Sequence, residues 1–194
     1  MIRGRLHWIF DLDGTLTVAQ HDFDAIRRQL GIAAGRPILE TLEELPAGRA
    51  APLYAHLDRI ERDLAGRARA APGAAELLSA LRARGARMGI LTRNRRPTAR
   101  RTLDACGLSG WFADEDILGR EEAPPKPDPG GIERLLARWR GTAADAVMVG
   151  DNRMDIAAGR AAGAAAVCVG ARNGGDAAGA DLWVQRLDQL LPEL

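Results

Sequence analysis

From Pro72 onward the sequence alternates between helical and strand patterns, and this alternation constrains the fold more than any other feature. Residues 72–85, PGAAELLSALRARG, have Pro near the start and Gly at the end, as helices often do. Residues 87–92, RMGILT, are typical of a strand. Further helices are predicted over about 97–106, 130–139 and 154–162, and strands near 117–118, 146–150 and 165–170. Strands separated by helices form parallel sheets, so we predict an α/β fold with a doubly wound, Rossmann-like parallel sheet.

Both ends of the sequence add elements to this sheet. Leu6, Trp8, Ile9 and Phe10 form a short apolar run that predicts a buried first strand. Near the other end, residues 181–184 and 187–191 predict a last strand and a last helix. The glycine-rich stretch before them, residues 170–180, is expected to be a flexible loop.

Residues 17–71 interrupt this pattern directly after the first strand. Their apolar residues recur at helical spacing in three stretches, which end near Gly31, near Pro46 and at Leu64. In the third stretch, Asp58 and Arg62 are four residues apart and are expected to form an outward-facing pair. We therefore predict a small helical insertion between the first strand and the rest of the sheet.

The ends of the predicted strands carry polar side chains, and ligands of doubly wound sheets bind beyond those ends. The first strand ends in FDLDGTLT, where Asp11 and Asp13, two apart in extended chain, can converge on one point. The strand ILT ends at Thr92, and AVMVG leads into Asp151 and Asp155. Taken singly, each has a structural explanation, such as an Asp-Gly turn or a helix cap. Together they predict four carboxylates and a hydroxyl at one sheet edge, an arrangement that needs a divalent cation, and oxygen ligands favour Mg²⁺.

Composition adds one hint and several exclusions. Of the 27 basic residues, 26 are Arg and one, Lys126, is Lys, which indicates a position where a compact ammonium is required. The formal charge of +1 argues against nucleic acid as the main ligand, and no apolar run is long enough to span a membrane. We expect a cytoplasmic protein. Cys106 and Cys168 lack metal-ligand spacing and are expected to be small core residues.

With DLDGTLT, LTRN, KPDP and GDNRMDI in that order, the sequence resembles the haloacid dehalogenase-like hydrolases, especially their phosphoglycolate-phosphatase-like branch. The resemblance spans nearly the whole chain. The helical insertion occupies the position of the family's cap. The resemblance therefore implies a catalytic core formed by residues 1–16 and 72–194 and a cap formed by residues 17–71.

The resemblance also implies a role for each motif residue. Asp11 matches the nucleophile that becomes an aspartyl phosphate, and Asp13 matches the acid that protonates the leaving oxygen. Thr92 and Lys126 match the groups that hold the phosphoryl oxygens, and Arg93 and Asn94 beside Thr92 are further candidates for substrate binding. Mg²⁺ would bind the Asp11 carboxylate, the backbone carbonyl of Asp13 and Asp151, with Asp155 in or just behind the shell. The implied reaction is hydrolysis of a small phosphorylated metabolite.

Four other functions have to be weighed against a phosphatase. A phosphomutase uses the same four motifs and releases an isomer in place of phosphate. A true dehalogenase would need no metal and would leave Asp13, Asp151 and Asp155 without a purpose. A receiver-like signalling module carries its phospho-accepting aspartate after a later strand, whereas here DxDGT follows the first. A catalytically dead binding protein is disfavoured because no motif position is missing.

The sequence does not identify the substrate. His21, Asp22 and Arg28 follow the nucleophile loop and are candidates for facing the leaving group, although such residues are more often a solvated helix start. The run RNRRPTARR, residues 93–101, contains five arginines. We interpret it as a solvated helix face in preference to a surface that steers a phosphorylated substrate.

Overall fold

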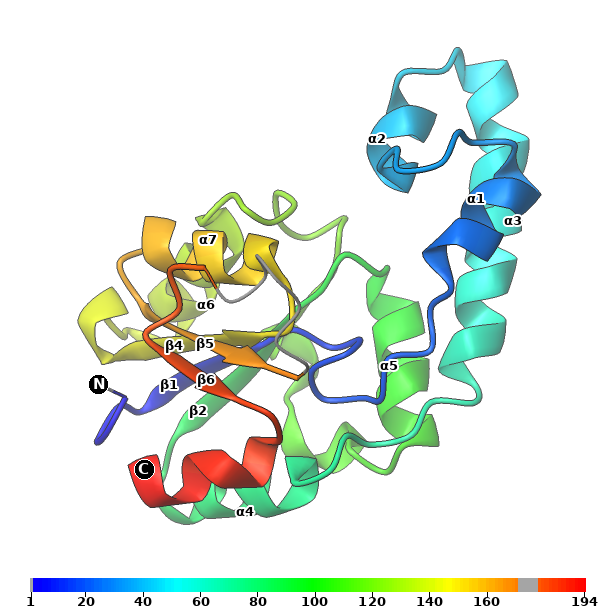
Figure 1. The fold of residues 1–194 in the computed structure, drawn as a ribbon. Helices are drawn as coiled ribbons and strands as arrows, with labels where there is room; N and C mark the ends of the chain where they lie inside the picture. Colours follow the sequence, from blue (N-terminus) through cyan, green and yellow to red (C-terminus); the bar gives the residue numbers. More distant parts are fainter. Residues whose placement is uncertain (1, 171–177) are drawn as a thin grey trace.

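The computed structural model describes residues 2–170 and 178–194, and these form one parallel six-stranded sheet with helices on both faces (Figure 1). The strand order is β3-β2-β1-β4-β5-β6. The strands are β1 (His7–Phe10), β2 (Arg87–Leu91), β3 (Ile117–Leu118), β4 (Ala146–Gly150), β5 (Ala165–Val169) and β6 (Leu182–Val184). The predicted α/β class with a doubly wound parallel sheet is confirmed.

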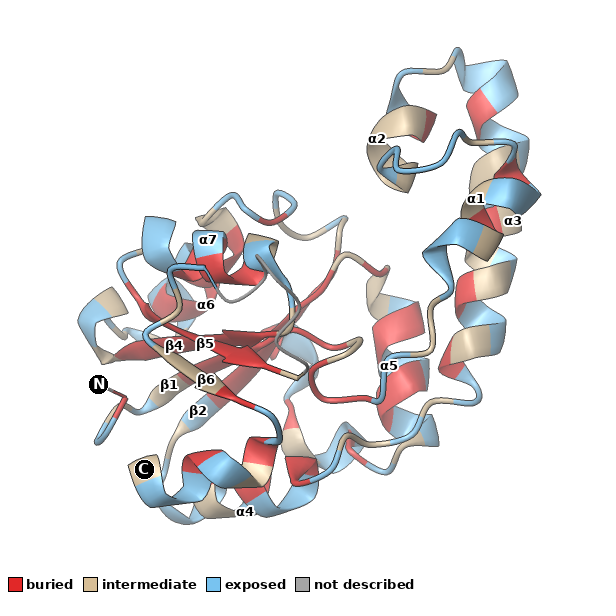
Figure 2. Cartoon of the chain, viewed as in Figure 1, coloured by how far each residue is buried: buried red, intermediate tan, exposed pale blue. Residues whose placement is uncertain are grey.

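Alternating side chains divide the core into two layers, one on each face of the sheet. On one face, Trp8 and Phe10 pack with α4 (Ala74–Ala83), α5 (Arg96–Ala105) and the C-terminal 3-10 helix η4 (Leu187–Glu193). On the other face, Ile9 packs with α6 (Gly130–Trp139) and α7 (Arg153–Ala161). The central strands are buried on both faces, as parallel sheets require (Figure 2).

The insertion, residues 17–71, holds α1 (Phe23–Leu30), α2 (Ile38–Glu43) and α3 (Ala47–Ala65). Ile26, Leu30, Leu42 and Leu57 form a separate apolar cluster there. The two segments that join the insertion to the core lie side by side, because the Val18 N–H donates to the Arg69 carbonyl (2.9 Å) and the Ala71 N–H to the Leu16 carbonyl (2.8 Å). In Figure 1 the insertion rises beyond the edge of the sheet, and the lower part of α3 runs beside α5.

Some expectations differ from the structure in detail. The last helix is a 3-10 helix, and Pro192 within it cannot donate to an α-helical ladder. The expected outward Asp58–Arg62 pair is wrong: the Asp58 carboxylate faces the core, and Arg62 Nε donates to the Asp58 backbone carbonyl (3.0 Å). Cys168 is buried in β5, and Cys106 is half-buried after α5. Most of the expected loop at 170–180 lies outside the described residues.

Among residues 2–170 and 178–194, no helix combines the length and apolar character that a membrane span requires.

Candidate active site

The ends of three neighbouring strands bring the predicted site residues to one edge of the sheet. β1 lies between β2 and β4, so their carboxyl ends are adjacent. Asp11 follows β1, and its N–H donates to the Val149 carbonyl of β4 (2.9 Å). Thr92 follows β2, and Asp151 follows β4. The strand order reverses between β1 and β4, which is where doubly wound sheets bind their ligands.

Asp11, Asp151 and Asp155 form a compact carboxylate cluster: one oxygen of each lies within 4.8 Å of the others. Asp155 belongs to the first turn of α7 and is almost completely buried. Its Oδ2 accepts a hydrogen bond from the Asn152 N–H (3.0 Å), while Asn152 Oδ1 accepts from the Met154 N–H (3.0 Å). These caps fix the start of α7 and thereby the position of Asp155 beside Asp11.

Lys126 lies between two of these carboxylates. Its Nζ is 2.5 Å from Asp11 Oδ1 and 2.5 Å from Asp155 Oδ1, and the side chain is only 4% exposed. Burial alone would lower the pKa of Lys126, but Asp11 and Asp155 outweigh burial and raise it. The two acids therefore stabilise the ammonium form of Lys126. One ammonium against three carboxylates leaves an excess of negative charge when all three acids are ionised.

This excess of negative charge contributes to raised pKa values of two of the acids. Burial, reinforced by the charges of Asp11 and Asp155, raises the pKa of Asp151 to about 7. Burial also raises the pKa of Asp155 to about 6, although Lys126 opposes it. A divalent cation would remove this repulsion, and carboxylate oxygens are the ligands that Mg²⁺ prefers. The donor set formed by Asp11, Asp151 and Asp155 could therefore hold a divalent metal ion.

Asp13 stands in a different environment from Asp11. Asn94 Nδ2 donates to Asp13 Oδ2 (2.6 Å), and His21 Nδ1 lies 3.9 Å from Asp13 Oδ1. Burial raises the pKa of Asp13, and His21 and Asn94 oppose that shift. Thr92 Oγ1 accepts from the Asn94 N–H (3.2 Å), which ties the two residues after β2 together. The two aspartates of the first motif thus have different neighbours.

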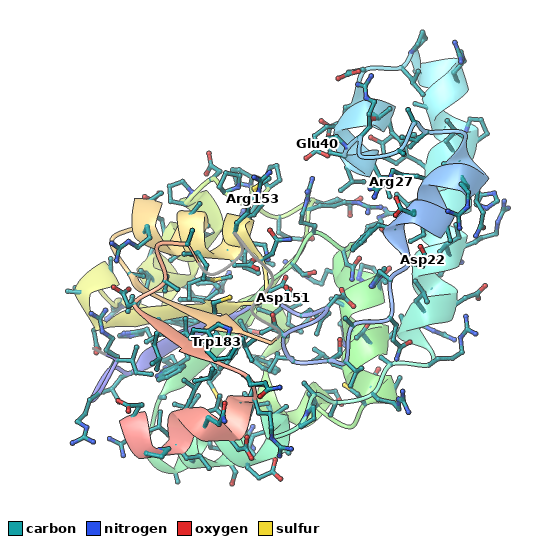
Figure 3. The ribbon with its side chains drawn as sticks, in the orientation of Figure 1. Asp22, Arg27, Glu40, Asp151, Arg153 and Trp183 are labelled. Carbon is teal, nitrogen blue, oxygen red and sulfur yellow. The ribbon has the colours of Figure 1, made fainter. Side chains whose placement is uncertain are left out.

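A cavity of about 290 Å³ lies between this sheet edge and the insertion. Its core side carries Asp11, Asp13, Thr92, Arg93, Asn94, Lys126, Asp151, Asn152, Met154 and Asp155. Its other side is lined by His21, Phe23, Ile26, Arg27, Pro37, Ile38, Leu39, Leu57 and Glu61 of the insertion. Figure 3 shows Arg27 and Glu40 on the side of the insertion that faces Asp151. The charged end of the cavity therefore belongs to the core, and most of the opposite wall is apolar.

The remaining sequence candidates divide into cavity residues and surface residues. Arg93 lines the cavity, and its guanidinium pairs with Glu40 of α2. His21 also lines it and stacks on Phe23, with ring centroids 5.4 Å apart. Asp22 instead caps α1 by accepting from the Ala25 N–H (2.8 Å), and Arg28 is exposed.

The arginine run after Thr92 is neutralised by acids to a large extent. Arg95 pairs with Asp58 and Glu121, Arg96 lies 3.7 Å from Glu122, and Arg100 pairs with Asp114. These partners come from the insertion, from the loop after β3 and from the turn before β3. The run is a set of structural ion pairs, which weakens its interpretation as a steering surface.

Sequence reasoning missed Glu61 and Arg120. Glu61 of α3 lines the cavity and is 9% exposed at its side chain, and Arg120 after β3 donates to it. One signal was present: Glu61 follows Leu57 by four residues, so an acid interrupts the apolar face of a predicted helix. Arg120 carries no such signal, because its partners lie 59 and 62 residues away.

Gly14 is required at the turn after Asp13, and its replacement gives a testable prediction. Its φ is +82°, and a Cβ there would lie 2.2 Å from Asp151 Oδ2. Gly14→Ala is therefore expected to displace Asp151. Because a 1 Å misplacement can cost on the order of 10²-fold in rate, we expect activity to fall by at least about tenfold. The measurement is steady-state phosphate release.

A matched control separates this displacement from backbone strain. Gly85 has a φ of +72° and no atom within 4 Å of a built Cβ. Gly85→Ala should thus share the cost of the left-handed conformation, roughly 1–2 kcal/mol, while keeping its activity. Equal activity in Gly14→Ala and Gly85→Ala would contradict the assigned role of Gly14.

Comparison with known proteins places the chain in a family. Residues 8–163 match the family model of the haloacid dehalogenase-like hydrolases, and the chain belongs to this family. Within it, the chain lies in the phosphoglycolate-phosphatase-like branch. It is 34% identical to a phosphoglycolate phosphatase of Rhodospirillum rubrum, over 80% of this chain and 75% of that one. It is also 34% identical to the plasmid phosphoglycolate phosphatase of Cupriavidus necator, over 94% and 90% of the two chains.

Solved structures agree with the fold. The structure is similar to that of a hydrolase from Pseudomonas syringae, with a TM-score of 0.80, 24% identity and 97% of each chain covered. The family and its named relatives make this chain a phosphoric monoester hydrolase. Membership of this family excludes the receiver-like signalling module.

Proposed function

We propose that this protein is a Mg²⁺-dependent phosphatase that hydrolyses a small phosphomonoester through an aspartyl-phosphate intermediate on Asp11. The observation that carries the proposal is the position of Asp11. Its carboxylate faces a cavity, contacts a buried ammonium at 2.5 Å and lies within 4.8 Å of oxygens of two further acids. The buried ammonium and a metal ion held by the neighbouring acids would together supply the positive charge that phosphoryl transfer to this carboxylate requires.

Asp11, Asp151 and Asp155, together with the backbone carbonyl of Asp13, are the groups that would hold the Mg²⁺. When bound, the ion supplies a Lewis acid that neutralises charge on the phosphoryl oxygens. Three carboxylates surround a single ammonium, and the unbalanced negative charge supports this assignment.

In the first step, an Asp11 oxygen forms a bond to phosphorus and the ester P–O bond breaks. Asp13 donates its proton to the leaving oxygen, so an alcohol departs. The raised pKa of Asp13, caused first by burial, supports a protonated starting state. Lys126 and the Thr92 hydroxyl hold the phosphoryl oxygens, and Lys126 also lowers the negative charge around Asp11.

In the second step, Asp13 takes a proton from water, and that water attacks the phosphorus of the aspartyl phosphate. The P–O bond to Asp11 breaks, which releases inorganic phosphate and restores both carboxyl groups to their starting states. Asn94, which donates to Asp13 Oδ2 at 2.6 Å, holds this side chain in place during both transfers.

The insertion acts as the cap of this enzyme in our proposal, with residues 1–16 and 72–194 as the catalytic core. A separate apolar cluster and a paired two-segment connection support this division. The cavity volume of about 290 Å³ is close to the lower end of the roughly 300–1,000 Å³ of small-molecule pockets, which supports a small metabolite as the substrate. Phosphoglycolate is the first compound to test, because two relatives are named for it. The cytoplasmic location stays a prediction.

The proposal is tested by incubating the protein with a panel of phosphorylated metabolites, with Mg²⁺ and with excess chelator. We expect phosphate release with Mg²⁺ and almost none with chelator, because the acid cluster would then repel the incoming phosphoryl group. Restoring Mg²⁺ should restore activity, which controls for unfolding. Full turnover in chelator would contradict the metal assignment, and an isomer without free phosphate would identify a phosphomutase.

A further inference from the structure

A buried ion-pair cluster connects the insertion to the core beside the candidate active site. We call it the Arg120 cluster: Asp58 and Glu61 from α3, Arg95 from the residue before α5, and Arg120 from the loop after β3. Arg120 Nη1 donates to both Glu61 oxygens, at 3.1 and 3.3 Å, and its Nη2 donates to Asp58 Oδ1 at 2.8 Å. Arg95 Nη1 donates to Asp58 Oδ2 at 3.1 Å.

The cluster is buried at its centre. The side chains of Arg120 and Glu61 are 15% and 9% exposed, whereas those of Arg95 and Asp58 are 42% and 23% exposed. Placing a carboxylate in this position is costly: burial raises the pKa of Glu61 to about 6, and Arg120 opposes that shift. A buried ion pair of this kind often adds little net stability compared with apolar residues of the same size. What it does provide is geometry, because the planar guanidinium fixes the direction of both acids.

Arg120 orients Glu61, and Glu61 is part of the wall of the substrate cavity. Glu61 and Leu57, one turn apart on α3, both line the cavity that contains Asp11 and Lys126. Arg120 itself does not line that cavity. It contacts Glu61 and Asp58 from the core side, so it is one of the groups that join α3 to the core next to the cavity.

We propose that Arg120 is a positioning residue that, through Glu61 and Asp58, holds α3 in the orientation that completes the substrate cavity over Asp11. The proposal rests on the proposed phosphatase function. Phosphoryl transfer to Asp11 itself uses core residues only, so the wall matters for leaving groups large enough to touch it.

Two probes separate these contributions. Acetyl phosphate carries a small leaving group, whereas 4-nitrophenyl phosphate carries an aryl group that must occupy the space between the core and the insertion. Arg120→Met is expected to lower kcat/KM for 4-nitrophenyl phosphate by roughly 10- to 100-fold, the scale of a misplaced binding wall, and for acetyl phosphate by less than about threefold. The proposed function fails only if the unaltered protein releases phosphate from neither these probes nor any metabolite of the panel; a wild-type enzyme active on both probes keeps the two hypotheses distinguishable.

The matched control is Arg100→Met. Arg100 of α5 pairs with Asp114 at 3.0 Å within the core, and both side chains are more than half exposed. An exposed pair of this kind contributes little to stability, so this variant should retain wild-type kinetics on both probes. Arg95→Met, at the exposed side of the Arg120 cluster, should show a weaker form of the Arg120→Met effect and covers the case in which Arg120→Met does not fold.

A double-mutant cycle provides the decisive readout. If Arg120 acts through Glu61, the double variant Arg120→Met with Glu61→Gln should lose no more on 4-nitrophenyl phosphate than Arg120→Met alone. Independent, multiplicative losses would overturn the proposal. So would equal losses on both probes, which indicate a general structural defect, or wild-type kinetics of Arg120→Met on the aryl substrate.

Discussion

Asp11→Asn is expected to abolish turnover, with no phosphate attached to the protein. An amide cannot form the acyl phosphate, and the adjacent Lys126 and Asp155 cannot substitute, because Lys126 is a protonated ammonium and Asp155 is held by Asn152 and Lys126. The loss should reach the limit of detection, since the reaction then has no nucleophile. Steady-state phosphate release and intact-mass measurement after mixing with substrate check the two parts of the expectation.

The fold of this variant should survive, which makes the result interpretable. Removing one charge from three crowded carboxylates relieves repulsion, so the melting temperature measured in chelator is expected to stay level or to rise. The control is Asp114→Asn, which removes the carboxylate from an exposed pair with Arg100 and should keep full activity. Phosphate trapped on the Asp11→Asn protein would show that another residue is the nucleophile.

The sequence predicted the fold, and it predicted that the core residues of the candidate site lie at one sheet edge, because both depend on local patterns. Asp11, Thr92 and Asp151 each follow a strand directly, and parallel strands bring such positions together once their order is known. Spacing alone placed Asp155 at the start of the next helix, which is where the capping box holds it. The solitary Lys126 was conspicuous by composition, and it is buried between Asp11 and Asp155.

The insertion side of the site was much less predictable. The three helices followed from apolar spacing, but which face of α3 meets the core depends on contacts across long stretches of sequence. Asp58 illustrates this limit: a favourable spacing to Arg62 indicated an outward pair, whereas Arg95 and Arg120 hold the carboxylate toward the core. A pair four residues apart on a helix is worth only about 0.3–0.5 kcal/mol, so two guanidinium contacts readily outweigh it.

Lys126→Arg is expected to inactivate the enzyme, although Arg is the basic residue that this chain uses at 26 of 27 positions. Lys126 Nζ contacts Asp11 and Asp155 at 2.5 Å each from a side chain that is 4% exposed. A guanidinium keeps the charge but is broader and planar, so it would displace one of the two acids or the phosphoryl oxygen that the ammonium is proposed to hold. We expect kcat to fall by roughly 10²- to 10³-fold, the usual cost of losing one preorganised donor.

Two further variants show whether the shape or the charge of Lys126 is responsible for the loss of activity. Lys126→Met removes the charge and should be at least as inactive as Lys126→Arg, whereas Arg100→Lys, the reverse exchange at an exposed pair, should behave as wild type. Measuring kcat and KM separately matters, because an effect confined to KM would indicate lost ground-state binding and not lost transition-state stabilisation. If Lys126→Arg keeps near-normal kcat while Lys126→Met fails, charge alone suffices at this position. The compact ammonium between Asp11 and Asp155 would then no longer explain why a chain built with Arg retains a single Lys.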